Sequence, residues 1–222
     1  MKISSIIYNR RRQLIYGLLC LLLAIIALGP DVHRQRVANR EREVRVTEQQ
    51  HVKSNHHQQA AGVMRTPINW HKSSETKPYP DLKKAKHLWV RVSLHGNRTY
   101  LYDGSKLLYT MYSTGGMYKR TGKHHRLKSM TPTGTFHVQA DRGDHFFNAA
   151  LGEGANYYVS WLYHGQFLFH SVPTKADGSY NVAEAKKLGK STGSHGCIRL
   201  SIADARFMEK NLPVGTKVVV QN

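Results

Sequence analysis

The stretch GSHGCIRLS, residues 193–201, places a thiol, an imidazole and a guanidinium in one turn of small residues. Cys197 is a candidate nucleophile, because thiolates attack carbonyl carbons and thiol pKa values fall beside positive charge or at a helix N-terminus. Gly196 lets the backbone approach a substrate closely, and Arg199 follows two residues on. A helix is expected to begin at Ser201, and its dipole favours the thiolate. These three features predict a thiol whose pKa is lowered.

A reactive thiol needs a group that moves protons. The strand-like run FLFHSVP carries His170 near its end, which makes His170 the candidate general base and acid. His164, in the turn before this run, is the alternative. Taken singly, a lone cysteine is most often a small buried hydrophobe and a lone histidine a structural residue. The occurrence of Cys197 and His170 together favours a catalytic role for both.

Alternating and apolar runs predict the strands that must position these groups. Residues 88–94 alternate strictly, and Asp103-Gly104 joins two further runs as a hairpin. His164-Gly165 joins a second pair of runs in the same way. Shorter strands are expected over 131–138 and 216–220.

Helices are few in this region. Ser201 and Asp204 form a capping signature before ADARFMEKNL, and a short helix is expected within 181–189. With six or seven short strands, residues 87–222 are therefore predicted to be a mostly β domain, a sandwich or a partly closed barrel with one or two short helices.

The N-terminal part has a different character. Residues 1–13 are basic and are expected in the cytoplasm, and the 18 residues from Gln13 to Pro30 carry no charge. In a helix they would extend roughly 27 Å, which predicts a transmembrane signal-anchor over 14–30. A cleaved signal peptide, giving a secreted form, is the competing interpretation. Residues 31–86 are polar and basic and are predicted to be a tether.

The net charge of +19 favours polyanionic partners. No nucleic acid is expected, because no dense basic helix stripe, zinc-finger spacing or RNA-binding aromatic signature occurs. Anionic wall polymers or membrane surfaces fit better. No metal or cofactor is predicted; a metal hydrolase would have to use some of His124, His125, His137 and His145, and adjacent histidines do not easily point at one ion.

Four motifs together resemble the L,D-transpeptidase catalytic domain, the YkuD-type family. STGSHGCIRLSIADA resembles its active-site signature, and the family's other motifs follow its order: TPTGTF at 131–136, FHS at 169–171 and LPVGTKVVV at 212–220. The resemblance covers roughly residues 87–222 and implies the fold and site of that family.

The resemblance implies a role for each matching residue. Cys197 would be the nucleophile, and His170 the base and acid, oriented by a backbone carbonyl such as that of Ser171. Arg199 would fix the turn or meet a substrate carboxylate. The oxyanion pocket and its loop would be formed by Ser194, His195, Gly196 and the N–H of Cys197.

The implied reaction is acyl transfer between peptidoglycan stem peptides, giving 3→3 cross-links through a Cys197 thioester. The catalytic domain would then lie outside the membrane, and protonation of His170 would remove activity in acid. An L,D-carboxypeptidase using the same site, or a non-catalytic wall-binding module with a structural Cys197, are the alternatives. The chain between His170 and Ser194 is longer than in the compact family form, which predicts an inserted flap over the site or a displaced histidine.

Overall fold

The computed structural model describes residues 64–122 and 126–222. The described residues belong to one compact unit. The predicted cytoplasmic segment 1–13, the predicted anchor over 14–30 and residues 31–63 of the predicted tether lie outside the described residues. Within the described ranges, no helix is long and apolar enough to cross a membrane.

A nine-stranded mixed sheet forms the body of the domain, in the order β6-β11-β1-β2-β3-β10-β9-β8-β7. β4 and β5 form a separate hairpin. The strands are β1 (Leu88–Ser93), β2 (Arg98–Asp103), β3 (Lys106–Thr114), β4 (Tyr118–Thr121), β5 (Arg126–Ser129), β6 (Gly134–His137), β7 (Arg142–Asn148), β8 (Glu153–Leu162), β9 (Phe167–Ser171), β10 (Ile198–Leu200) and β11 (Lys217–Gln221). The mostly β prediction is confirmed, with more strands than the six or seven expected.

Both predicted hairpins form. β2 pairs with β3 around Gly104, whose φ is +56°, and β8 pairs with β9 through Tyr163 and His164, whose φ values are +53° and +43°. Two successive residues with positive φ match the twist of a tight hairpin. The second hairpin brings His170 back along β8 into the sheet.

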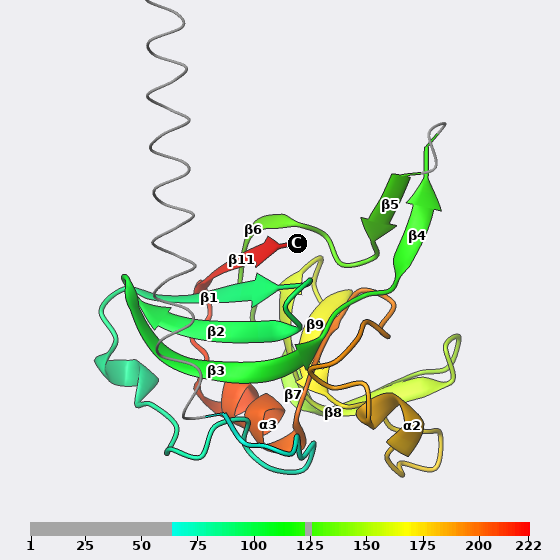
Figure 1. Cartoon of the computed structure of the whole chain (residues 1–222), viewed down its shortest axis with the longest axis horizontal. Coiled ribbons are helices and arrows are strands. Elements are labelled where there is room, and N and C mark those ends of the chain that lie inside the picture. The colour runs from blue at the N-terminus through cyan, green and yellow to red at the C-terminus, as the bar shows by residue number, and fades with distance from the viewer. Residues whose placement is uncertain (1–63, 123–125) are drawn as a thin grey trace, which may run out of the picture. The chain divides into compact units, whose positions relative to one another are not determined.

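The sheet curls into a half-barrel around one core (Figure 1). Alternate side chains of β1 and β11, including Val90 and Val220, point inward and meet Trp161 and Phe169 from the β8–β9 side. The helix α3 (Ile202–Asn211) packs against β8 and β9, and buries Met208 in the same core. The curl, and not a second sheet, encloses the core.

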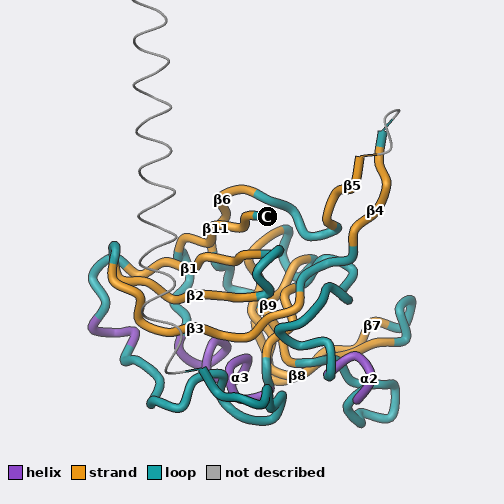
Figure 2. Tube along the Cα trace, in the orientation of Figure 1, coloured by secondary structure: helices purple, strands orange, loops and turns teal. Residues whose placement is uncertain are grey.

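Helix is a minor component of the described residues, as the purple segments of Figure 2 show. Ser201 caps α3 as predicted, its hydroxyl accepting from the N–H of Asp204. α2 (Val182–Ala185) is only four residues long, with Asn181 as its cap. A 3₁₀ turn, η1 (Leu82–Lys84), lies just before β1.

Residues 64–86, predicted as part of the tether, instead pack against the half-barrel. The hydroxyl of Ser74 donates to the carboxylate of Asp204, and Glu75 accepts the N–H of Thr110 at 2.8 Å. Leu82 is buried in the main core. The polar composition that suggested a loose chain supplies buried hydrogen bonds here, so the folded domain includes residues well before His87.

Candidate functional site

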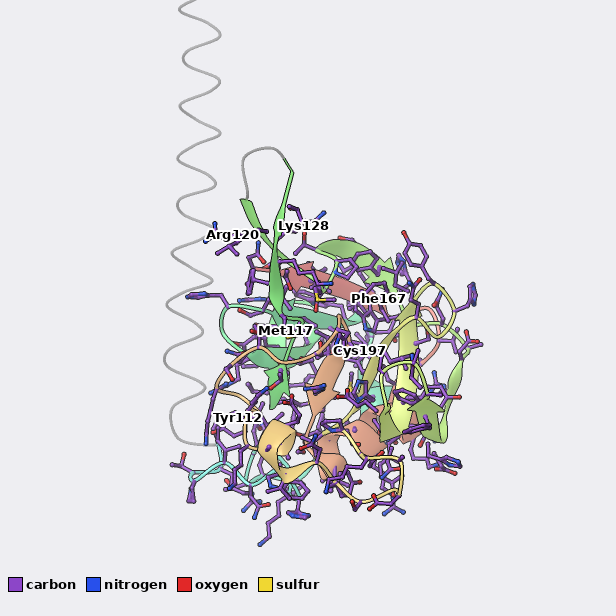
Figure 3. The ribbon with its side chains drawn as sticks, turned by 90° about the vertical axis from the view of Figure 1, so that its right-hand side faces the viewer. Tyr112, Met117, Arg120, Lys128, Phe167 and Cys197 are labelled. Atoms are coloured by element: carbon purple, nitrogen blue, oxygen red, sulfur yellow. The ribbon has the colours of Figure 1, made fainter. Side chains whose placement is uncertain are left out.

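The strand register brings the candidate nucleophile and base together. β10 runs parallel to β9, with Ile198 beside Phe169 and Arg199 beside His170. Cys197 immediately precedes β10, and alternation places its side chain, like that of Arg199, on the same face of the sheet as His170. Both line one open cavity of about 570 Å³, and Cys197 lies near the base of the β4–β5 hairpin in Figure 3.

Cys197 is half-buried, and its thiol donates to the carbonyl of Gln166 at 3.8 Å. Burial raises the pKa of this thiol to about 11, although a backbone hydrogen bond from Leu168 and the charge of Arg199 act to lower it. The expected lowering is therefore wrong. β10 separates Cys197 from the start of α3 by four extended residues, about 13 Å, which places the thiol outside the reach of the helix dipole.

His170 is buried at the end of β9, with its ring edge-on to that of Phe146 at 5.5 Å. Its Nδ1 lies 2.6 Å from the carbonyl oxygen of Ser171, and because a carbonyl only accepts, Nδ1 carries the proton. Burial, followed by the charge of Arg199, lowers the pKa of His170 to about 3. The imidazole is thus neutral, with Nε2 available to accept a proton.

Ser194 braces the loop that carries the thiol. Its hydroxyl accepts from the N–H of Gly196 at 3.0 Å and donates to the carbonyl of Cys197 at 2.5 Å. The φ of Gly196 is +138°, and a Cβ there would lie 2.6 Å from the Phe167 ring. Only glycine therefore fits at this position.

Not all of the backbone N–H groups predicted to stabilise an oxyanion are available to a substrate. The N–H of Gly196 is already donated to Ser194, which leaves the N–H of Cys197 as the candidate donor within this loop. His195 is exposed and lines the cavity. It can contact a substrate from the rim.

Arg199 is buried and does not line the cavity. Its guanidinium forms two contacts with Glu153, at 2.6 and 2.8 Å, and one with Glu184 at 2.6 Å, and its side chain is 2% exposed. Of the two roles implied for it, this geometry matches fixing the turn. A substrate carboxylate would have to displace two carboxylates to reach it.

The segment between His170 and Ser194 does not cover the site. None of its residues lines the cavity; Val172, Ala185 and Leu188 instead pack in a second core behind it. Glu184 from this segment holds Arg199. The segment therefore packs beside the site and holds Arg199 instead of forming the expected flap over the cavity, and His170 is not displaced.

The β7–β8 turn forms the cavity wall that the sequence did not indicate. It contributes Phe146, Phe147, Asn148, Ala149, Leu151 and Glu153. Phe147 and Leu151 are each 48% exposed, and exposed apolar side chains beside a turn were the signal available in HFFNAALGEG. This wall is mostly apolar.

The remaining histidines lie elsewhere. His164 contacts Asp141 at 3.1 Å and does not line the cavity. His137 and His145 belong to β6 and β7, the two ends of the sheet order, whereas 124 and 125 fall outside the described residues. Among the residues the structure describes, no three candidate ligands gather around a point.

A scan of protein-family models supports the same conclusion as the geometry. The model of the L,D-transpeptidase catalytic domain, YkuD, matches residues 87–220. This chain belongs to the L,D-transpeptidase family, whose members are cysteine-dependent enzymes.

The chain is also similar to individual proteins. L,D-transpeptidase YciB of Bacillus subtilis (strain 168) is 44% identical over 156 residues, which cover 70% of this chain and 76% of that protein. Among solved structures, an L,D-transpeptidase from Mycobacterium smegmatis is 20% identical with a TM-score of 0.45, over 61% of this chain and 59% of that one. A fused amidase/peptidase and peptidoglycan-binding protein from Clostridium acetobutylicum is 26% identical with a TM-score of 0.42, over 65% and 55%.

Proposed function

We propose that this protein is a peptidoglycan L,D-transpeptidase that forms 3→3 cross-links between stem peptides. The observation that carries the proposal is that Cys197 and His170 line one cavity, with the Nδ1 proton of His170 held by Ser171. This arrangement leaves Nε2 to take the proton from the thiol.

The acyl-transfer steps follow from these groups. As Sγ attacks the carbonyl of the third stem residue, Nε2 of His170 accepts the thiol proton, and the N–H of Cys197 donates to the developing oxyanion. The bond to the terminal D-Ala breaks, its amine takes the proton from His170, and a thioester remains on Cys197. The side-chain amine of a second stem then attacks the thioester and frees the thiol.

The raised pKa of the thiol and the lowered pKa of the imidazole indicate when the proton is transferred. Both groups are neutral before substrate binds, so the proton moves during attack and not beforehand. His170 acts as a general base toward a neutral thiol. No ATP is needed, since cleavage of the peptide bond to D-Ala supplies the free energy for the thioester and then for the new amide bond.

The N-terminal segments fit this role. We propose that residues 14–30 anchor the chain in the cell membrane, with 1–13 in the cytoplasm and the catalytic domain on the wall side. The net charge of +19 would hold the domain near anionic wall polymers.

The test is to incubate the full chain with disaccharide tetrapeptide stems and to weigh the products. Cross-linked dimers support transfer, whereas tripeptides alone would indicate an L,D-carboxypeptidase. Cys197→Ala should abolish both products and the thioester adduct seen by intact-mass spectrometry. Unchanged turnover in that variant would mean a structural cysteine and refute the mechanism.

A further inference from the structure

The hairpin of β4 and β5 projects from the half-barrel (Figure 1) and carries uncompensated positive charge. Lys119, Arg120 and Lys128 are exposed, and no acidic residue occurs between Gly115 and Ala140. None of these three cations takes part in an ion pair recorded among the described residues. The hairpin is therefore free to bind an external anion.

The strand register concentrates this charge. Lys119 pairs directly with Lys128, so two ammonium groups share one face of the hairpin. Like charges at directly opposed positions destabilise a strand pair, and an anion bound between them would remove the repulsion. Arg120 belongs to the other face, and Figure 3 shows Arg120 and Lys128 on opposite sides of the ribbon.

The second face combines charge with apolar surface. Alternation places Tyr118 and Leu127 on the same face as Arg120, and these two side chains are 39% and 63% exposed. Met117, at the base of β4, is 37% exposed. This face can attract an anionic group of a polymer through Arg120 and contact the less polar parts of the polymer through the exposed ring and aliphatic side chains.

The hairpin is rooted in the loop that carries the nucleophile. The N–H of Met117 donates to the carbonyl of Ser194 at 2.9 Å, and the hydroxyl of Thr131 donates to the carbonyl of Gly196 at 2.8 Å. The N–H of Met130 closes the base by donating to Met117 at 2.8 Å. The base of the hairpin is therefore fixed to the loop that precedes Cys197.

We propose that the β4–β5 hairpin binds carboxylates of the peptidoglycan strand whose stem peptide occupies the cavity. The inference rests on the proposed function, since it takes the polymer at the cavity to be peptidoglycan. Stem peptides repeat along a glycan strand, and each presents carboxylates that the lysine pair on one face of the hairpin and Arg120 on the other can contact. The hairpin would increase affinity for the polymer without taking part in the chemistry on a single stem.

The test measures co-sedimentation of the full chain with isolated sacculi from which phosphodiester polymers have been stripped. A variant carrying K119Q, R120Q and K128Q should bind about tenfold more weakly at low salt. The matched control K83Q, K84Q and K86Q removes three charges from exposed lysines around η1 and should bind within twofold of the unmodified chain. Sacculi whose carboxylates have been amidated should lose the hairpin-dependent part of the binding.

Several results would overturn the proposal: equal loss in both triple variants, binding that survives amidation, or binding that needs the phosphodiester polymers. An unchanged unfolding midpoint, together with a smaller loss in the single variant Lys119→Gln, excludes misfolding as the cause. On a soluble single stem, kcat/KM of the hairpin variant should stay within twofold of the unmodified chain, and a parallel loss there would also contradict the proposal. Sedimentation needs no turnover, so a chain that binds sacculi through the hairpin but consumes no stem refutes only the proposed function.

Discussion

Arg199 and Glu153 form an ion pair beside the loop that carries Cys197, with N–O distances of 2.6 and 2.8 Å. Glu153 begins β8 and lines the cavity, whereas Arg199 lies in β10, two residues after Cys197. Glu184 completes the cluster from the segment between His170 and Ser194. The loop that carries Cys197 is thus fixed by an ion-pair cluster whose central guanidinium is buried.

Removal of this guanidinium should destabilise the domain strongly. Arg199→Ala leaves two carboxylates without their shared partner and opens a void at a fully buried position, so we expect a loss of about 3–5 kcal/mol in the free energy of unfolding. Urea unfolding measures it. Lys84→Ala is the control, because the Lys84–Asp81 pair spans 3.8 Å and the lysine is 85% exposed, and it should lose less than about 1 kcal/mol. Similar losses in the two variants would contradict the assigned role.

Thiol reactivity should follow the raised pKa of Cys197. With that pKa near 11 and the pKa of His170 near 3, alkylation of Cys197 by iodoacetamide should accelerate about tenfold per pH unit from pH 7 to 9. The alkylation rate should show no inflection between pH 5 and 8. Enzymatic activity, which needs neutral His170, should be lost in acid only near pH 3. The rate is measured by intact mass, with glutathione as the free-thiol reference. A rate plateau below pH 7 would instead reveal a thiolate–imidazolium pair.

Gly196→Ala should remove activity through geometry. The new Cβ would meet the Phe167 ring at 2.6 Å and the Met130 carbonyl at 3.0 Å, and the resulting shift of the thiol should lower kcat/KM by about 100-fold. Gly104→Ala is a matched control: its φ is also positive, at +56°, but nothing lies within 4 Å of the added carbon. That variant should lose some stability and keep its activity. Full activity in Gly196→Ala would show that the loop is not constrained as described.

Stability should fall as pH rises through the titration of Asp204. Burial raises the pKa of this carboxyl from 3.8 to about 6, so the folded state holds a proton that the unfolded chain releases. The stabilisation is complete below pH 3.8 and is lost as pH rises past 6, a change of about 3 kcal/mol. Urea unfolding of the unmodified chain and of Asp204→Asn at pH 4.5 and 7.5 tests this. A stability difference between the two proteins that stays constant with pH would contradict it.

The sequence alone located the main elements and the candidate pair Cys197 and His170. Strict alternation over 88–94, the Asp103-Gly104 turn and the Ser201 cap were sufficient to predict β1, the β2–β3 hairpin and α3, because these signals act over a few residues. Strands that lack alternation were missed: β10 is buried at all three residues, and β4 is exposed at all four. Their place is set by neighbours distant in the chain.

Cys197 and His170 were identifiable because residue type and local motif mark them, but their ionisation was not. The turn suggested a lowered thiol pKa, and burial between β9 and β10 reversed its direction, since desolvation depends on what the whole fold packs around the sulfur. Long-range packing also determines three other features. These are the ion-pair partners of Arg199, the packing of residues 172–193 in the second core and the packing of residues 64–86 against the half-barrel. Each depends on long-range packing, which sequence spacing does not encode, whereas the chemistry-bearing residue types are fixed by the sequence itself.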